Sequence, residues 1–250
     1  MIPNPIHKVL STFQNCGVRA LLMGGQACVF YGGAEFSRDT DFAIHADKDN
    51  LGRLLTALDE LKASVIAVPP FSMAHLHGGH AVHFRCHHPE VAGLRVDLMS
   101  KMRGVAEFDE LWERRTTLQG EDGTIYELLS LPDLIQAKKT QRDKDWPMIR
   151  RLIEADRVAC QGIPSAEQVR LWLREGRTPE LLIELAGQFP REAAAMAAGL
   201  RPLLNAALQG DRPGIEAGLA DEERRERAAD RAYWDPLKKE LERMRHTSTG

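Results

Sequence analysis

The chain has 250 residues, of which 43% are hydrophobic and 28% are charged, and its formal net charge is -3. This composition is that of an ordinary globular protein, with enough apolar material for one large domain or two modest ones. The slightly negative charge argues against a protein whose whole surface binds nucleic acid, although it is compatible with a local basic patch.

The cysteines and the N-terminus indicate a cellular compartment. The four cysteines are widely spaced without a C-x-x-C pair, which predicts free thiols in a reducing environment. The opening MIPNPIHKVL lacks a basic start followed by a long apolar stretch, so no signal peptide is predicted. No apolar run approaches the ~18 residues that span a bilayer. We therefore expect a cytoplasmic protein with no membrane partner.

The first 130 residues predict helices alternating with strands. Apolar side chains recur at helical spacing or in short buried runs in six segments, which are in chain order a helix over 5–14, a strand over 19–25, a short helix over 26–33, a strand over 40–46, a helix over 50–61 and a strand over 64–68. Pro69-Pro70 stops the last of these strands.

Two hairpins are predicted next. HAVHFRC (80–86) and GLRVDLMS (93–100) alternate apolar and polar residues on either side of a loop. RTTLQ (115–119) and TIYELL (124–129) flank Glu121-Asp122-Gly123, which is typical of a hairpin turn.

Beyond residue 130 the pattern becomes helical throughout. Residues 131–155 predict two helices broken near Arg142 to Asp145, and prolines separate further helical segments. The charged run over 221–245 predicts a final helix or a pair of helices, exposed and carrying i,i+4 ion pairs. We therefore predict an α+β domain over 1–130 and a helical region over 131–250.

Asp39 and Asp41 stand in RDTDFAI at the entry to the strand predicted over 40–46. Residues i and i+2 of a strand point to the same face, so the two carboxylates project together. Carboxylates this close repel each other, and one takes up a proton unless a cation lies between them. Mg²⁺ is the natural cation, because it prefers oxygen ligands and binds carboxylates together with substrate phosphates. The alternative is a solvated turn, since Asp before a strand is common.

Asp97 in LRVDLMS is the best candidate for a third carboxylate. It lies between Val96 and Leu98 in a predicted strand, where a lone acid needs a reason. If this strand lies beside the one over 40–46, Asp97 completes an acidic triad. The alternative is a strand acid that points to solvent.

Gly24 and Gly25 end one predicted strand and open the following helix. Without side chains, this turn can bring backbone N–H groups against phosphate oxygens. Arg38 comes immediately before the acidic pair and is placed to bind either Asp39 or a phosphate.

The motifs GGQA, RDTDFAI and RVDLMS together resemble the signature of the nucleotidyltransferase superfamily. In that superfamily a strand ends in Gly-Gly or Gly-Ser, a D-x-D pair follows, and a third Asp lies on a neighbouring strand. The chain is similar to bacterial minimal nucleotidyltransferases and to the abortive-infection toxin group, over about residues 15–155. The resemblance implies a nucleotidyltransferase-like α+β fold with a mixed β-sheet core, followed by a helical C-terminal region.

LPDLIQAKKTQRDKDW resembles a helix that such relatives carry after the core. By that resemblance Lys138 or Lys139 meets the triphosphate, and Asp145 is a further polar site residue; the alternative for the lysines is a solvated helix face. Two features depart from the family pattern. Gly25 stands where many relatives have Ser, and the spacing from the lysines to Arg142 is slightly short.

The resemblance implies transfer of a nucleoside monophosphate from an NTP to an acceptor, with release of pyrophosphate. Asp39, Asp41 and Asp97 would be catalytic and would bind Mg²⁺ or Mn²⁺. The residues implied in nucleotide binding are Gly24, Gly25, Arg38, Lys138, Lys139 and Asp145. The acceptor is open between RNA such as a tRNA end, a protein hydroxyl and a small molecule. A toxin role with an antitoxin partner comes from the resemblance alone.

Two other functions stay open at this stage. The first is a non-catalytic nucleotide-binding or interaction module of the same fold. The second is a zinc-dependent nucleic-acid binder, because imidazole is a common zinc ligand and six of the nine histidines fall close together. These are His75, His77, His80, His83, His87 and His88. Cys86 is the only nearby thiol, and no H-E-x-x-H spacing occurs.

Overall fold

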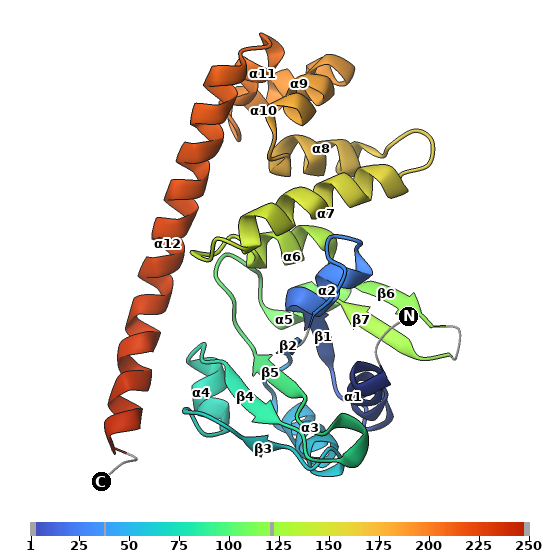
Figure 1. Cartoon of the computed structure of the whole chain (residues 1–250), viewed down its shortest axis with the longest axis vertical. Helices are drawn as coiled ribbons and strands as arrows, with labels where there is room; N and C mark the ends of the chain where they lie inside the picture. The colour runs from blue at the N-terminus through green and yellow to red at the C-terminus, as the bar shows by residue number, and fades with distance from the viewer. Residues whose placement is uncertain (1–3, 38, 121–122, 248–250) are drawn as a thin grey trace. The chain divides into compact units, whose positions relative to one another are not determined.

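The computed structural model describes residues 4–37, 39–120 and 123–247 (Figure 1). The chain divides into two compact units. The first unit comprises Met1–Phe30, Glu35–Ala137 and Tyr233–Gly250, and the second comprises Tyr31–Ala34 and Lys138–Ala232. The domain boundary predicted after residue 130 stays a prediction.

A seven-stranded sheet forms the centre of the first unit, in the order β3-β4-β5-β2-β1-β7-β6. The pairs β2–β5 and β1–β7 are parallel, and the other four pairs are antiparallel. This mixed sheet confirms the predicted α+β fold. The strands are β1 (Ala20–Met23), β2 (Thr40–Ile44), β3 (Ser64–Val65), β4 (Val82–Arg85), β5 (Arg95–Met99), β6 (Thr116–Gln119) and β7 (Ile125–Leu128).

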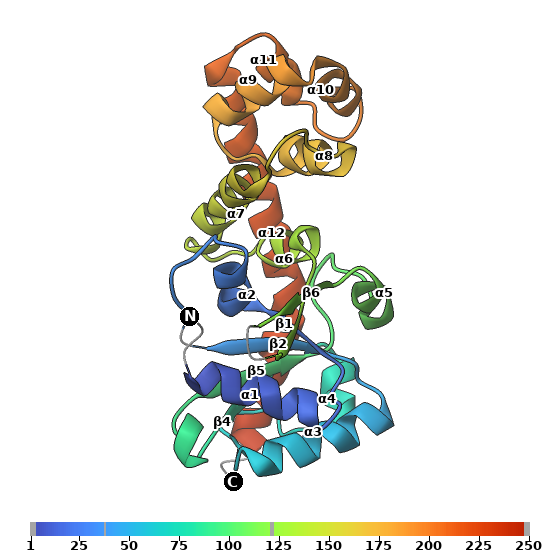
Figure 2. The same cartoon turned by 90° about the vertical axis from the view of Figure 1, so that its right-hand side faces the viewer.

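Helices cover both faces of this sheet, as Figure 2 shows nearly edge-on. On one side lie α1 (Asn4–Asn15) and α3 (Lys48–Glu60), and on the other lie α2 (Gly24–Phe30) and α6 (Leu131–Ala137). The core between α1 and the sheet is apolar, and the rings of Phe13 and Phe42 lie 4.8 Å apart between centroids. Burial of these amphipathic faces is what holds the short strands and helices in place.

Local signals explain where α3 begins and ends. The Asp47 side chain accepts hydrogen bonds from the backbone N–H groups of Asp49 and Asn50, which satisfies donors that the first helical turn leaves open. The helix stops ahead of Lys62, which has a left-handed φ of 49°. The next segment then leads into β3.

The third predicted strand is much shorter than expected. β3 covers only Ser64–Val65, with both residues exposed at the edge of the sheet. The Ile66 N–H still donates to the His83 carbonyl at 3.0 Å, but Pro69 and Pro70 follow and have no N–H to continue the ladder.

Both predicted hairpins are confirmed, since β4 pairs with β5 and β6 pairs with β7 in antiparallel register. Glu121 and Asp122, which were predicted to form the second turn, lie outside the described residues. Three short helices complete this part of the first unit: α4 (Met73–His77), a 3₁₀ helix (Pro89–Val91) and α5 (Phe108–Glu113).

The second unit is helical. It contains α7 (Asp145–Ala159), α8 (Ala166–Glu175), α9 (Pro179–Gln188), α10 (Pro190–Ala197), α11 (Leu204–Leu208) and the part of α12 (Arg212–Thr247) that ends at Ala232. Its core includes Trp146 and Trp172. The break before α7 begins at Lys138 rather than near Arg142, so Lys138 and Lys139 stand in a turn and not on a helix.

The charged run near the C-terminus forms one continuous helix, α12, which passes through Pro236 without a break. It carries the expected i,i+4 ion pairs, for example between Glu223 and Arg227. Among the described residues, no helix has both the length and the apolar character needed to cross a lipid bilayer.

Candidate functional site

Asp41 and Asp97 lie side by side in the first unit. β2 and β5 pair in parallel, and their register makes the Cα atoms of Asp41 and Asp97 direct partners. Neighbouring strands are about 4.8 Å apart, so paired residues of this kind point to the same face of the sheet. Asp39 is exposed and comes one residue before β2. The strand adjacency that the acidic triad requires is therefore present.

Alternation along the hairpin separates this polar face from the core. In β5 Val96 and Leu98 are buried, while Arg95 and Asp97 point the other way. In β4 the same alternation places His83 on the face of Asp97, and the two residues are partners in the antiparallel register. The acid in LRVDLMS thus stands on the side of the sheet that is not filled by the apolar core.

Gly24 is in close contact with the Asp41 carboxylate. Met23, the last residue of β1, is the register partner of Asp41, and α2 begins at the next residue. Gly24 has a φ of +67°, and a β-carbon there would lie 2.6 Å from Cγ of Asp41. Any other residue would overlap the carboxylate, so the first glycine of the pair is required by the acid beside it.

Gly25 makes a similar close approach to Ser37. A β-carbon at Gly25 would lie 2.5 Å from Oγ of Ser37, and the Ser37 hydroxyl donates to the carbonyl of Asp39 at 3.2 Å. The two glycines therefore accommodate the segment that carries the acidic pair. Arg38, which was predicted to bind Asp39 or a phosphate, lies outside the described residues.

Arg95 and His83 bind the Asp97 carboxylate, and neither was singled out from the sequence. Arg95 Nε donates to Asp97 Oδ1 at 2.7 Å, and His83 Nδ1 lies 2.9 Å from the same oxygen. Burial raises the pKa of Asp97, but the hydrogen bonds with His83 and Arg95 outweigh it and leave that pKa below its ordinary value. Asp97 is therefore held as a carboxylate. The signal for Arg95 was its position two residues before Asp97 in a strand.

The acidic residues suit a divalent ion in the type of their donor atoms and in the strand register that places Asp41 beside Asp97. Their donors are carboxylate oxygens from adjacent segments, which is the ligand set that Mg²⁺ and Mn²⁺ prefer. As the side chains lie, no group of three or more His, Cys, Asp or Glu residues in the described part of the chain is arranged to hold a metal. The hydrogen bonds of Asp97 use Oδ1, and Arg95 is the cation bonded to it.

Lys138, Lys139 and Asp145 belong to the second unit. Lys138 is buried, with its Nζ 3.4 Å from Oδ1 of Asp145, and Thr140 donates to Oδ2 of the same carboxylate at 2.6 Å. Lys139 Nζ donates to Glu175 Oε1 at 2.9 Å. Both lysines thus have a carboxylate partner within their own unit, and their role in nucleotide binding stays a prediction.

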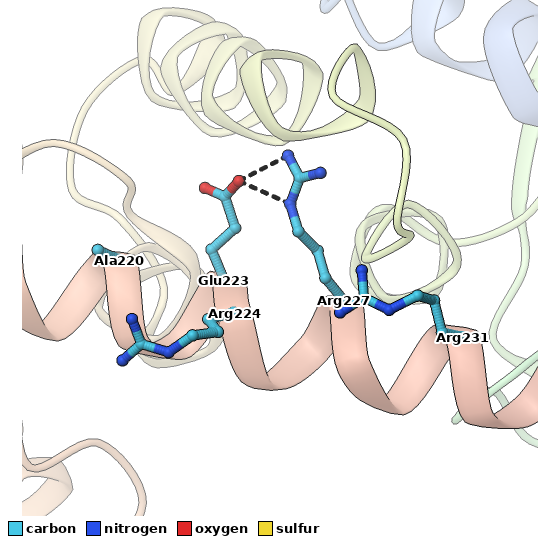
Figure 3. A pocket seen from close by; sticks show the side chains of 5 residues that line it. All are labelled: Ala220, Glu223, Arg224, Arg227 and Arg231. Carbon is cyan, nitrogen blue, oxygen red and sulfur yellow. Dashed lines mark hydrogen bonds and ion pairs between the residues drawn. The ribbon is translucent and has the colours of Figure 1, made fainter.

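A cavity of about 310 Å³ opens on α12 in the second unit (Figure 3). It is lined by Ala220, Glu223, Arg224, Arg227 and Arg231. Arg227 bonds both Glu223 and Asp143, and Arg224 pairs with Asp221, so acidic partners offset these two arginines. These contacts are those of a solvated, ion-paired helix.

The clustered histidines do not form one group in the described residues, although the rings of His75 and His80 lie 6.0 Å apart between centroids. In the described residues each bonds a different group: Ser72 for His75, the Ala46 carbonyl for His77, Glu240 for His80, Asp97 for His83, Ser64 for His87 and the Glu90 N–H for His88. A zinc site built from three of these histidines, which was one of the alternatives, is not among the groups that the described residues form.

Comparisons with known proteins give a distant likeness. No known protein family matches the chain, and no curated protein matches it. The solution structure of the antibiotic-resistance factor ANT(2'')-Ia has 17% identity and a TM-score of 0.36, covering 78% of this chain and 94% of that one. A crystal structure of ANT(2'')-Ia in complex with adenylyl-2''-tobramycin has 14% identity and a TM-score of 0.35, covering 82% and 94%. Likeness of this degree assigns no function to the chain.

The contact between Gly24 and Asp41 can be tested by substitution. We expect Gly24→Ala to lower the free energy of unfolding by about 2 kcal/mol, since a left-handed residue with a side chain costs about 1–2 kcal/mol before any overlap. In an Asp41→Ala background the same change should cost less, because the overlap with the carboxyl group is gone and only the contact with Cβ of residue 41 remains. Urea denaturation of the four proteins gives the coupling.

The matched control is Gly52→Ala, since Gly52 lies inside α3 with open space around it. That change should stabilise the protein by about 0.5–1 kcal/mol. Equal costs of Gly24→Ala in the two backgrounds would show that residue 24 does not contact Asp41.

The buried Asp145 predicts a pH dependence of stability in the second unit. Burial raises its pKa, but Lys138, Thr140 and Arg142 outweigh burial and leave the pKa below the ordinary value. A lowered folded pKa stabilises the protein above the unfolded pKa of about 4, and this stability is lost as the pH falls through the folded pKa. Asp145→Asn should therefore cost about 3 kcal/mol at pH 7 and progressively less toward pH 3.

Urea denaturation from pH 7 to pH 3 measures this difference. Asp143→Asn is the control in the same turn, because the Asp143 side chain is 97% exposed and its ion pair is worth little. Stability curves of wild type and Asp145→Asn that run parallel over this range would contradict the assignment.

Proposed function

We propose that the protein is a nucleotidyltransferase that moves a nucleoside monophosphate from an NTP to an acceptor, with Mg²⁺ or Mn²⁺. The observation that carries this proposal is the parallel register that sets Asp41 beside Asp97, with Asp39 just outside the strand. Two like charges on neighbouring strands repel, and a divalent ion shared with phosphates removes the repulsion. A solvated turn would need neither the register nor the glycine that accommodates Asp41.

The residues of the chain have distinct roles in this proposal. Asp41 and Asp97 would hold the ion, and Asp39 would add a third carboxylate from the segment before β2. His83 and Arg95 orient the Asp97 carboxylate through Oδ1. The turn at Gly24 and Gly25 packs against Asp41 and Ser37, so phosphates bound to an ion on Asp41 would lie beside the backbone at the start of α2.

A divalent ion held by Asp41 and Asp97 would lower the pKa of an acceptor hydroxyl and neutralise charge on the phosphates of the NTP. The chain contributes position and charge, and no covalent protein nucleophile is needed. The acceptor class that the proposal covers is a hydroxyl-bearing RNA, protein or small molecule.

We expect Asp41→Asn and Asp97→Asn to lower pyrophosphate release by at least about 100-fold, the size of effect seen when one charge-stabilising group is removed from an active site. The wild-type protein is incubated with each labelled NTP and cell extract, with and without Mg²⁺. Pyrophosphate is measured, and label is traced to RNA, protein or small molecules.

The control is Asp59→Asn, an exposed aspartate at the end of α3, which should keep full activity and normal thermal unfolding. Folded Asp41→Asn protein with wild-type turnover would refute the proposal. Nucleotide binding by the wild type without pyrophosphate release would indicate the non-catalytic module instead.

A further inference from the structure

On the polar face of the sheet, the guanidinium of Arg95 lies beside Asp97. Arg95 lies two residues before Asp97 on β5, so both side chains project to the same face. Its Nε donates to Asp97 Oδ1 at 2.7 Å, and one terminal nitrogen lies 3.0 Å from His83 Nδ1. The Arg95 side chain is 40% exposed, whereas that of Asp97 is only 15% exposed. Arg95 thus reaches into the acidic face from the solvent side.

Arg95 also interacts with the two other aspartates. The hydrogen bond with Asp97 raises the pKa of Arg95, burial opposes the rise, and attraction to Asp97, Asp39 and Asp41 adds to it. Its charge is permanent at any physiological pH. Arg95 therefore supplies part of the neutralisation that a metal ion would otherwise provide.

We propose that Arg95 is a resident cation that competes with free divalent ions for the aspartates, so that the metal enters mainly as its complex with the nucleotide. This inference rests on the proposed function and adds an order of binding to it. A unit charge a few ångströms from a divalent ion opposes that ion's binding even in a high dielectric. The phosphates of a nucleotide attract the same guanidinium, which removes the opposition when metal and nucleotide arrive together.

The geometry around Asp97 allows Arg95 to be drawn toward phosphates without loss of the ligand. His83 Nδ1 lies 2.9 Å from Oδ1, so His83 can hold this oxygen when Arg95 leaves it. The hydrogen bonds of Asp97 in the described residues spare Oδ2, which is then the oxygen available to the ion. Arg95 is therefore a positioning residue for Asp97, and it lowers the affinity of the site for free divalent ions.

The test is Mn²⁺ binding by isothermal titration calorimetry, with no turnover involved. In the absence of nucleotide, Arg95→Met should bind free Mn²⁺ roughly tenfold more tightly than the wild type, from the loss of one nearby positive charge. Arg95→Lys keeps the charge and should stay close to the wild type. With an α,β-methylene NTP analogue present, the difference between Arg95→Met and wild type should shrink to less than about threefold.

The matched control is Arg115→Met. Arg115 bonds Glu127 on β7 at 2.8 Å, beside strands at the opposite edge of the sheet from β4. The Arg115→Met variant loses an arginine–carboxylate pair of the same kind but leaves the acidic face unchanged. Its affinity for Mn²⁺ should therefore equal that of the wild type. Thermal unfolding of each variant checks that it is folded.

The outcomes separate this inference from the function. Equal or weaker Mn²⁺ binding by folded Arg95→Met, or equal tightening by Arg115→Met, overturns the role of Arg95 while the proposed function stands. If Asp41→Asn binds Mn²⁺ as tightly as the wild type, the ion does not bind at this face. Both the competition by Arg95 and the metal site of the proposed function are then wrong.

Discussion

The parallel pairing of β2 with β5 is the constraint on which the candidate site depends. It makes Asp41 and Asp97 register partners, and a slip by one residue would turn one of the two carboxylates to the opposite face of the sheet. The apolar neighbours fix this register, because Val96 and Leu98 must stay in the core. The free energy of core burial is thus what holds two like charges together. The repulsion between the two carboxylates is relieved locally, because Arg95 and His83 bind Asp97.

Much of this fold could be predicted from the sequence because its elements carry strong periodic signals. The helix at the N-terminus, the glycine turn and both hairpins were predicted at nearly their observed positions. The strand over 64–68 was overestimated, since an apolar run does not show how many residues pair at an edge, where β3 has only β4 beside it and pairs over Ser64 and Val65. The helix break predicted near Arg142 to Asp145 is present but begins earlier, since α6 ends at Ala137 and α7 begins at Asp145.

The acidic residues of the candidate site could be predicted from the sequence, but the residues that bind them could not. The sequence shows a D-x-D pair and an aspartate inside a strand, and carboxylates in such positions need a cation. The pairing of Asp97 with His83 depends on the β4–β5 register, which the long loop between the strands does not specify. The contacts of Lys138 and Lys139 with carboxylates could not be predicted from the sequence either. Glu175 lies 36 positions from Lys139, and sequence spacing gives no indication of that contact.

The glycine pair shows how a backbone feature can be explained by a side chain on another strand. A left-handed φ alone would tolerate Asn or Asp at position 24, because their short polar side chains visit that region. The space around Gly24 does not, since any β-carbon there would meet Asp41. A turn that served only to connect β1 with α2 would have no such restriction. The requirement for glycine therefore arises from the position of the carboxylate, and it links the first motif of the sequence to the second through one van der Waals contact.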